Sequence, residues 1–195
     1  MTKKEVRRFL NTHRDVELSA AKFEYSLHLC RNVENVMFKL AERVNKRDDV
    51  DKKTIEEMIK KASSPDEIIK LMRKELVTGE RVKVINKAID IEEEILPLIK
   101  SRVLTTGQHM FIENALKFFL RCKTNCSQWI MENYQEIRSE YMKSMLCLVL
   151  GFRGDASMID FLIEEAERFE RDYPDENYDQ APFLAVQELS VRFLN

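Results

Sequence analysis

Apolar residues recur every three or four positions along most of this chain, and the clearest such stripe begins soon after residue 15. Its members are Ala21, Tyr25, Leu29, Val33, Val36, Leu40 and Val44. That spacing places side chains on one face of an α-helix, whereas no segment alternates with a period of two for long enough to form a strand. The chain has only four glycines and four prolines, fewer turn residues than an all-β fold needs. The sequence therefore predicts an all-α fold.

The same spacing sets the expected helix boundaries. A serine, a proline and an acid at positions 64, 65 and 67 form a strong helix start, with Ser64 as N-cap and Glu67 completing a capping box. We expect Gly79 to close that helix and Pro97 to kink or break a later one. Residues 46–53 should form a solvated connection. The expected helices cover residues 2–11, 15–44, 54–62, 64–79, 82–89, 91–104, 108–121, 125–135, 137–150, 155–172 and 179–194.

Three helical hairpins of similar build follow one another in the second half of the chain. When the segments around Leu116 and Leu146 are aligned without gaps, Leu120 falls on Leu150, which gives a period of about 30 residues. The second of these segments should end at Gly151. Periods of this size in a helical pattern are typical of a stacked solenoid, in which each hairpin contacts its neighbours.

These hairpins resemble HEAT-like helical repeats, in the broad sense that includes the short bacterial repeats. Ile95–Ile99 resembles the Leu-Pro of a first helix, Phe111–Lys117 resembles a second helix, and Leu148–Gly154 resembles the Leu-Gly end of a second helix. The resemblance covers about residues 91–195 and implies an α-α superhelix that binds proteins, as most members do. The Asp and Arg of the usual repeat ladder are missing here, and an irregular helical bundle is the alternative.

The length of 195 residues fits a single all-helical domain over residues 1–195. Within it, residues 1–60 would form an N-terminal helical cap or hairpin, and residues 64–195 the stacked hairpins. No apolar run is long enough to span a membrane, and no secretory signal is visible at the start of the chain. We therefore expect a cytoplasmic protein whose four cysteines are reduced.

Charge is distributed unevenly along the chain. The formal net charge is −2, but residues 155–195 hold 11 acidic and 3 basic residues, whereas the first 80 residues hold 18 basic and 15 acidic ones. A polyanion would be repelled by this C-terminal segment. We therefore expect a protein or peptide partner and no nucleic acid, and a homo-oligomer stays open.

Few residues suggest catalytic or metal chemistry. Cys122 and Cys126 have a spacing that would place two thiolates on one helix face, with Cys147 or His109 as further ligands. Closed zinc sites usually show two paired spacings, and only one is present. The phosphate-binding glycine motifs and the common hydrolase motifs are absent. We therefore predict no catalytic residue, no metal and no cofactor.

The most distinctive loop runs from Tyr173 to Asp179 and places two aromatic residues among three acids. Ordered loops on rigid scaffolds often carry function, and tyrosine is favoured at protein interfaces. The alternative is that both rings fold back over the last helical pair. Polar residues of the second helices are further candidates. The predicted binding residues are Tyr173, Asp175, Glu176, Tyr178, Asp179, Lys117, Lys143 and Gln187.

These observations favour a non-enzymatic module for protein–protein interaction or scaffolding. The alternative from another class is a HEAT-like DNA-repair glycosylase or another nucleic-acid-binding enzyme, which would need a basic, aromatic concave face. A small basic patch at Lys3, Lys4, Arg7 and Arg8 is interpreted as a solvated helix face because acids lie nearby in sequence.

Overall fold

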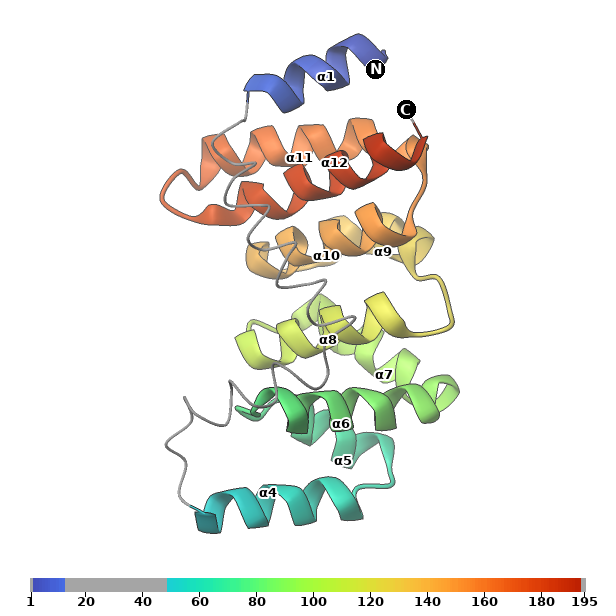
Figure 1. Ribbon diagram of the computed structural model, residues 1–195, viewed down its shortest axis with the longest axis vertical. Coiled ribbons are helices and arrows are strands. Elements are labelled where there is room, and N and C mark those ends of the chain that lie inside the picture. The colour runs from blue at the N-terminus through green and yellow to red at the C-terminus, as the bar shows by residue number, and fades with distance from the viewer. Residues whose placement is uncertain (1, 13–48, 194–195) are drawn as a thin grey trace. The chain divides into compact units, whose positions relative to one another are not determined.

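The computed structural model describes residues 2–12 and 49–193, so the helix predicted over residues 15–44 lies outside the described residues (Figure 1). Contacts group the described residues into two compact units. We call residues 49–123 the middle unit. Residues 2–12 and 124–193 form the C-terminal unit, which therefore contains the first described helix as well as the last. None of the described helices is long and apolar enough to cross a membrane.

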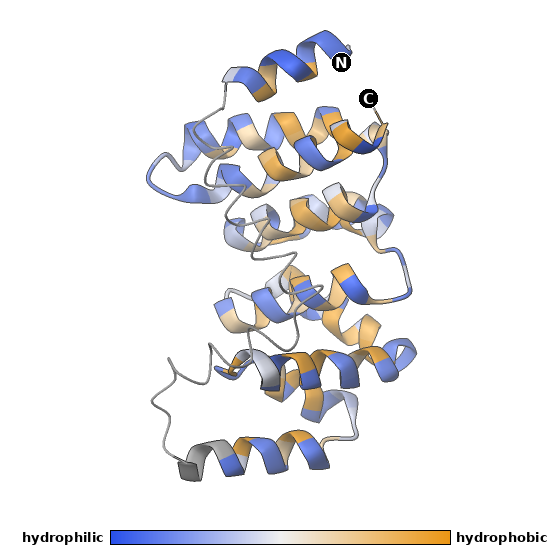
Figure 2. Ribbon diagram, viewed as in Figure 1, coloured by the Kyte–Doolittle hydropathy of each residue, from blue (hydrophilic) through white to orange (hydrophobic). Residues whose placement is uncertain are grey.

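The middle unit contains five helices, and α6 lies at its centre. They are α4 (Asp49–Lys61), α5 (Pro65–Met72), α6 (Thr78–Asp90), α7 (Glu92–Thr105) and α8 (His109–Arg121). The helix α6 contacts the other four, and Figure 2 shows apolar and polar turns mixed along each helix, as an amphipathic packing requires. The connection predicted over residues 46–53 is wrong in part, because α4 begins at Asp49. A run of charged residues is compatible with an exposed helix.

The start of α5 has the predicted capping box. The backbone N–H of Glu67 donates to Ser64 Oγ (3.4 Å), and the backbone N–H of Ser64 donates to Glu67 Oε2 (3.1 Å). These bonds satisfy donors that the first helical turn leaves without partners. The helix α7 runs through Pro97 without a break.

The prediction that Gly79 closes the preceding helix is wrong. The helix α5 ends at Met72, and Gly79 is the second residue of α6. The backbone N–H of Val77 donates to Glu80 Oε2 (2.9 Å), which is the type of side-chain contact that starts a helix. The glycine therefore lies just inside a helix start.

The C-terminal unit is arranged around its last helix. Its elements are α1 (Lys3–Thr12), α9 (Ser127–Asn133), the 3₁₀ turn η1 (Tyr134–Glu136), α10 (Glu140–Arg153), η2 (Ala156–Met158), α11 (Ile159–Asp172), η3 (Asn177–Asp179) and α12 (Gln180–Phe193). The helix α12 contacts α1, α10 and α11, as Figure 1 shows. It buries seven of its 14 residues and α10 buries nine of its 14, so these two helices supply most of the core of the unit.

Gly151 does not end α10, contrary to the prediction, because the helix continues to Arg153. Its role is to allow close packing against α12. A Cβ atom at Gly151 would clash with Ala185 Cα and would lie 2.6 Å from Ala185 Cβ. The Gly151 carbonyl also accepts a hydrogen bond from Arg192 Nη1 (3.0 Å). The residue without a side chain is therefore needed by the tertiary contact and not by a helix terminus.

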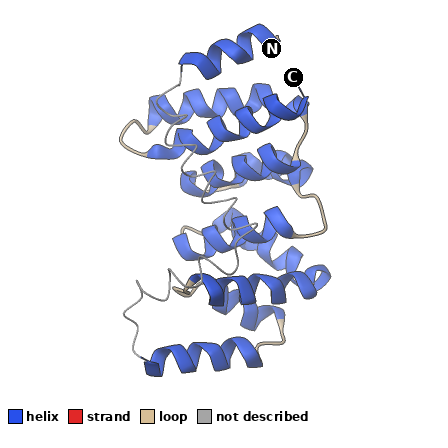
Figure 3. Cartoon of the chain, in the orientation of Figure 1, coloured by secondary structure: helices blue, strands red, loops and turns tan. Residues whose placement is uncertain are grey.

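Every regular element in residues 2–12 and 49–193 is helical (Figure 3), which confirms the all-α prediction. The aligned leucines lie in helices, with Leu116, Leu146 and Leu150 buried and Leu120 half-buried. Leu116 belongs to the middle unit, whereas Leu146 and Leu150 belong to the C-terminal unit. The stacking of hairpins into an α-α superhelix stays a prediction.

Candidate functional site

Three half-buried tyrosines from separate elements meet on the C-terminal unit. Tyr141 lies in the first turn of α10, Tyr173 caps the end of α11, and Tyr178 lies in η3. The ring centroid of Tyr178 is 6.1 Å from that of Tyr141 and 5.7 Å from that of Tyr173. The fully buried ring of Phe169 supports them, with its centroid 5.8 Å from that of Tyr178. We call Tyr141, Tyr173 and Tyr178 the tyrosine surface.

Local hydrogen bonds hold the loop that carries two of these rings. The backbone N–H of Glu176 donates to the Tyr173 carbonyl (3.0 Å), which closes a β-turn with Pro174 at the second position, where proline is favoured. Ser144 Oγ on α10 donates to the Tyr178 carbonyl (2.7 Å). The loop is therefore tied both to itself and to a neighbouring helix, which fixes the rings in position.

Acidic side chains surround the tyrosine surface. Asp175 and Glu176 are exposed at the tip of the loop. Burial, and after it the negative charges of Glu176 and Glu140, raise the pKa of the Tyr178 phenol. This hydroxyl therefore stays protonated at neutral pH and is available as a hydrogen-bond donor.

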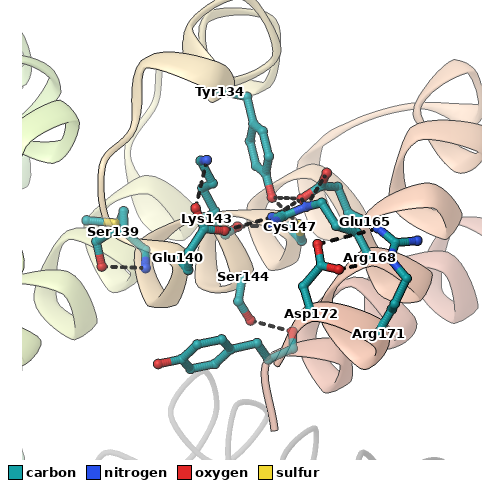
Figure 4. Close-up of polar contacts among 12 residues, drawn as sticks. Tyr134, Ser139, Glu140, Lys143, Ser144, Cys147, Glu165, Arg168, Arg171 and Asp172 are labelled. Atoms are coloured by element: carbon teal, nitrogen blue, oxygen red, sulfur yellow. Dashed lines mark hydrogen bonds and ion pairs between the residues drawn. The ribbon is translucent and has the colours of Figure 1, made fainter. Parts of the chain in front are cut away.

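A buried polar network joins η1, α10 and α11 (Figure 4). The Tyr134 hydroxyl donates to Glu165 Oε2 (2.7 Å) and lies 3.5 Å from Cys147 Sγ. The Cys147 thiol donates to the Lys143 carbonyl (3.4 Å). Tyr134, Cys147 and Glu165 are all buried, so these bonds satisfy polar groups that water does not reach.

Arg168 neutralises two carboxylates in this network. Its Nη2 atom lies 2.7 Å from Glu165 Oε2 and 2.9 Å from Glu140 Oε2. Its guanidinium also lies over the Phe169 ring, 4.2 Å from the centroid. The hydrogen bonds that Arg168 donates to Glu165 raise the pKa of the guanidinium above its ordinary value. Lys143 Nζ pairs with Glu140 Oε1 (2.9 Å). Arg168 and Lys143 are therefore already paired with acids.

Two groups of the network, the Cys147 thiol and the Tyr134 phenol, are held in their neutral forms. Burial raises the pKa of the Cys147 thiol to about 12, so the thiolate that would act as a nucleophile is not formed at neutral pH. Burial first, and then the neighbouring Cys147 and Glu165, raise the pKa of the Tyr134 phenol well above its ordinary value. Both groups stay protonated and act through hydrogen bonds. Among the residues that the structure describes, no group of three or more His, Cys, Asp or Glu side chains is arranged to hold a metal ion.

The structure brings together only some of the residues predicted to bind a partner. Tyr173 and Tyr178 are in contact, and Asp175 and Glu176 are exposed beside them. Asp179 is half-buried in the same loop. The remaining predicted residues are also half-buried and lie in helices, Lys117 on α8 of the middle unit, Lys143 on α10 and Gln187 on α12.

Sequence reasoning missed Tyr141 and Glu140, which start α10 and contribute to the same surface. Only the tertiary packing of α10 against the loop brings them there, so no local pattern could have found the group. The pairing of Glu140 with Lys143 could have been predicted, because residues three apart on a helix are neighbours.

Comparison of the chain with models of known protein families, with curated proteins and with solved structures gives no match.

Proposed function

We propose that this protein is a non-enzymatic interaction module and that the tyrosine surface binds a protein segment carrying lysine or arginine side chains. The observation that carries the proposal is the grouping of three half-buried tyrosine rings beside exposed acids. Tyrosine gives large, rigid contact areas and is enriched in interface hot spots.

The charges beside the rings favour a cationic partner. Arg168 and Lys143 are paired with Glu140 and Glu165, whereas Asp175 and Glu176 are exposed at the loop tip. A lysine or arginine side chain of a partner could lie on a tyrosine face and approach these carboxylates. Such cation–π contacts contribute roughly 0.5–1 kcal/mol at exposed sites and more where water is excluded.

A zero-length cross-linking experiment tests the proposal. Carbodiimide joins carboxylates to lysine amines that are in contact. Treated mixtures of the protein with native lysate should therefore yield peptides in which Asp175 or Glu176 is linked to a partner's lysine. The variant Tyr141→Ser/Tyr173→Ser should lose the same partner. Links confined to other carboxylates, or a partner unaffected by the tyrosine changes, would show that this surface does not bind it.

A matched pair of neutralising variants separates a specific surface from general acidity. Asp175→Asn/Glu176→Gln removes two adjacent exposed acids beside the rings, and Glu93→Gln/Glu94→Gln removes two adjacent exposed acids from α7 of the middle unit. We expect only the first to weaken capture of the partner. Equal weakening by both would indicate attraction by net charge alone.

A further inference from the structure

Among the longer helices of the C-terminal unit, α1 buries the fewest side chains. It buries only Val6 and Phe9, one turn apart, whereas α11 buries six residues and α12 seven. Figure 2 shows α1 as mainly hydrophilic with a few apolar turns. A helix of ten residues is marginal in water without tertiary packing, so these two side chains hold α1 in place.

The surface that α1 covers, which we call its seat, lies on α12 around Phe183. The Phe9 ring packs against the Phe183 ring with centroids 5.8 Å apart, and Phe183 is itself buried. This ring pair and the burial of Val6 are the apolar contacts that hold α1 against α12.

The helix α1 is basic, whereas α11 of the same unit carries exposed acids. Four exposed basic side chains lie along α1, namely Lys3, Lys4, Arg7 and Arg8. The helix α11 presents three exposed acids that share one face, at Asp160, Glu164 and Glu167. A basic helix with two apolar residues one turn apart therefore complements this part of the unit, and α1 is one such helix.

The start of α1 is capped within its own sequence. The Thr2 backbone N–H donates to Glu5 Oε2 (2.7 Å), and the Glu5 backbone N–H donates to Thr2 Oγ1 (3.4 Å). This capping box lies within the segment and needs no contact with the rest of the unit. Elements with few buried contacts open at the lowest free energy, so undocking of α1 should be the first local opening of the unit.

We propose that α1 is a displaceable occupant of the α12 face around Phe183, and that this face binds a basic amphipathic helix of a partner protein in its place. The partner helix would place two apolar side chains one turn apart where Val6 and Phe9 lie, and would carry Lys or Arg toward the acids of α11. The inference uses a different surface from the tyrosine surface and does not depend on it.

The test uses the full chain labelled with ¹⁵N and a synthetic peptide of residues 2–12 as the probe helix. The variant Val6→Ala/Phe9→Ala leaves the α12 face uncovered, and Asn11→Ala is a control at an exposed, uncharged position of the same helix. Adding the peptide should shift amide resonances around Phe183. We expect the uncovered variant to bind at least about tenfold more tightly than the wild type and the control, because their face is free only in the opened fraction.

Four results would overturn the proposal, and the first three concern peptide binding. They are the absence of saturable shifts in the uncovered variant, equal affinities of the variant and the wild type, and unchanged binding of a peptide with Phe9→Ala. A fourth is a wild-type chain that dimerises with concentration in light scattering while the uncovered variant does not. That result would make a second copy's α1 the occupant instead of a partner helix.

Hydrogen exchange on the unmodified chain gives a measurement that does not depend on how the variants fold. Amides of α1 should exchange at least about 100-fold faster than those of α12, because α1 opens locally while α12 opens only with the unit. Equal protection of the two helices would show that α1 is an integral part of the fold and would overturn the proposal.

Discussion

Replacing Gly151 by alanine should destabilise the C-terminal unit, although alanine is the better helix former. The added Cβ would clash with Ala185 Cα and would lie 2.6 Å from Ala185 Cβ and 3.2 Å from the Ala185 carbonyl carbon. Two of these three atoms belong to the backbone of α12, so no side-chain rotation removes the overlap. The two helices must move apart, and the packing on both sides of the contact must adjust.

The expected loss follows from two opposing effects. Overpacking a well-packed contact costs about 1–3 kcal/mol, whereas replacing glycine by alanine inside a helix contributes up to about 1 kcal/mol in the other direction. Because backbone atoms are involved, overpacking should dominate. We expect the free energy of unfolding to fall by about 1–2 kcal/mol.

Urea unfolding followed by the fluorescence of Trp129 measures this loss, because Trp129 is the only tryptophan of the chain and lies on α9 of the same unit. Gly107→Ala is the matched control, because a Cβ there would meet nothing within 4 Å. Far-UV circular dichroism should show a change within about 0.5 kcal/mol for the control.

The double variant Gly151→Ala/Ala185→Gly tests the contact directly. Removing Ala185 Cβ relieves one overlap and leaves the one with Ala185 Cα, so the two changes should be coupled and the recovery incomplete. If Gly151→Ala proved as stable as the wild type, the reasoning would be refuted, and α10 and α12 would not approach closely at this point.

Three further predictions concern the core, pH and nucleic acid. Leu146→Ala or Leu150→Ala should each cost about 2–5 kcal/mol in urea unfolding, because both side chains are fully buried, and a loss below about 1 kcal/mol would contradict that burial. Burial raises the pKa of Cys147 from an ordinary 9.0 to about 12, so the unfolded thiol ionises first. The contribution of Cys147 to the free energy of unfolding should therefore be constant below about pH 9 and be lost as the pH rises from about 9 to 12, so the fall in this range should be less steep in Cys147→Ala, and identical pH profiles would speak against this. Fluorescence anisotropy with duplex DNA at about 0.15 M salt should show no saturable binding tighter than about 10⁻⁶ M, and tighter, salt-sensitive binding would favour the repair-enzyme alternative.

The sequence predicted the helices well because their signal is local. The spacing of Met158, Leu162, Ala166 and Phe169 predicted a helix over residues 155–172, and the structure has η2 and α11 there. The glycines were misinterpreted because one residue type serves several purposes. Gly151 allows two helices to approach, whereas Gly79 lies inside a helix start. Only the packing partner distinguishes these uses from a helix end.

The candidate site was predictable only where its members are neighbours in sequence. Tyr173 and Tyr178 lie in one loop, and the unusual composition of that loop identified them. Tyr141 and Glu140 come from α10 and join the group through tertiary contacts, which periodicity does not encode. Lys143 was predicted as a binding residue, but its ammonium group already forms an ion pair with Glu140.

The membership of α1 in the C-terminal unit has a consequence for synthesis of the protein. Chains emerge from the ribosome N-terminus first, and units generally fold as their residues become available. The middle unit is complete once residue 123 has emerged, whereas Val6 and Phe9 have no seat until α12 has been made. The helix α1 is therefore translated long before its native contacts are available, and in the meantime its two apolar side chains are open to chaperones or to any partner that recognises them.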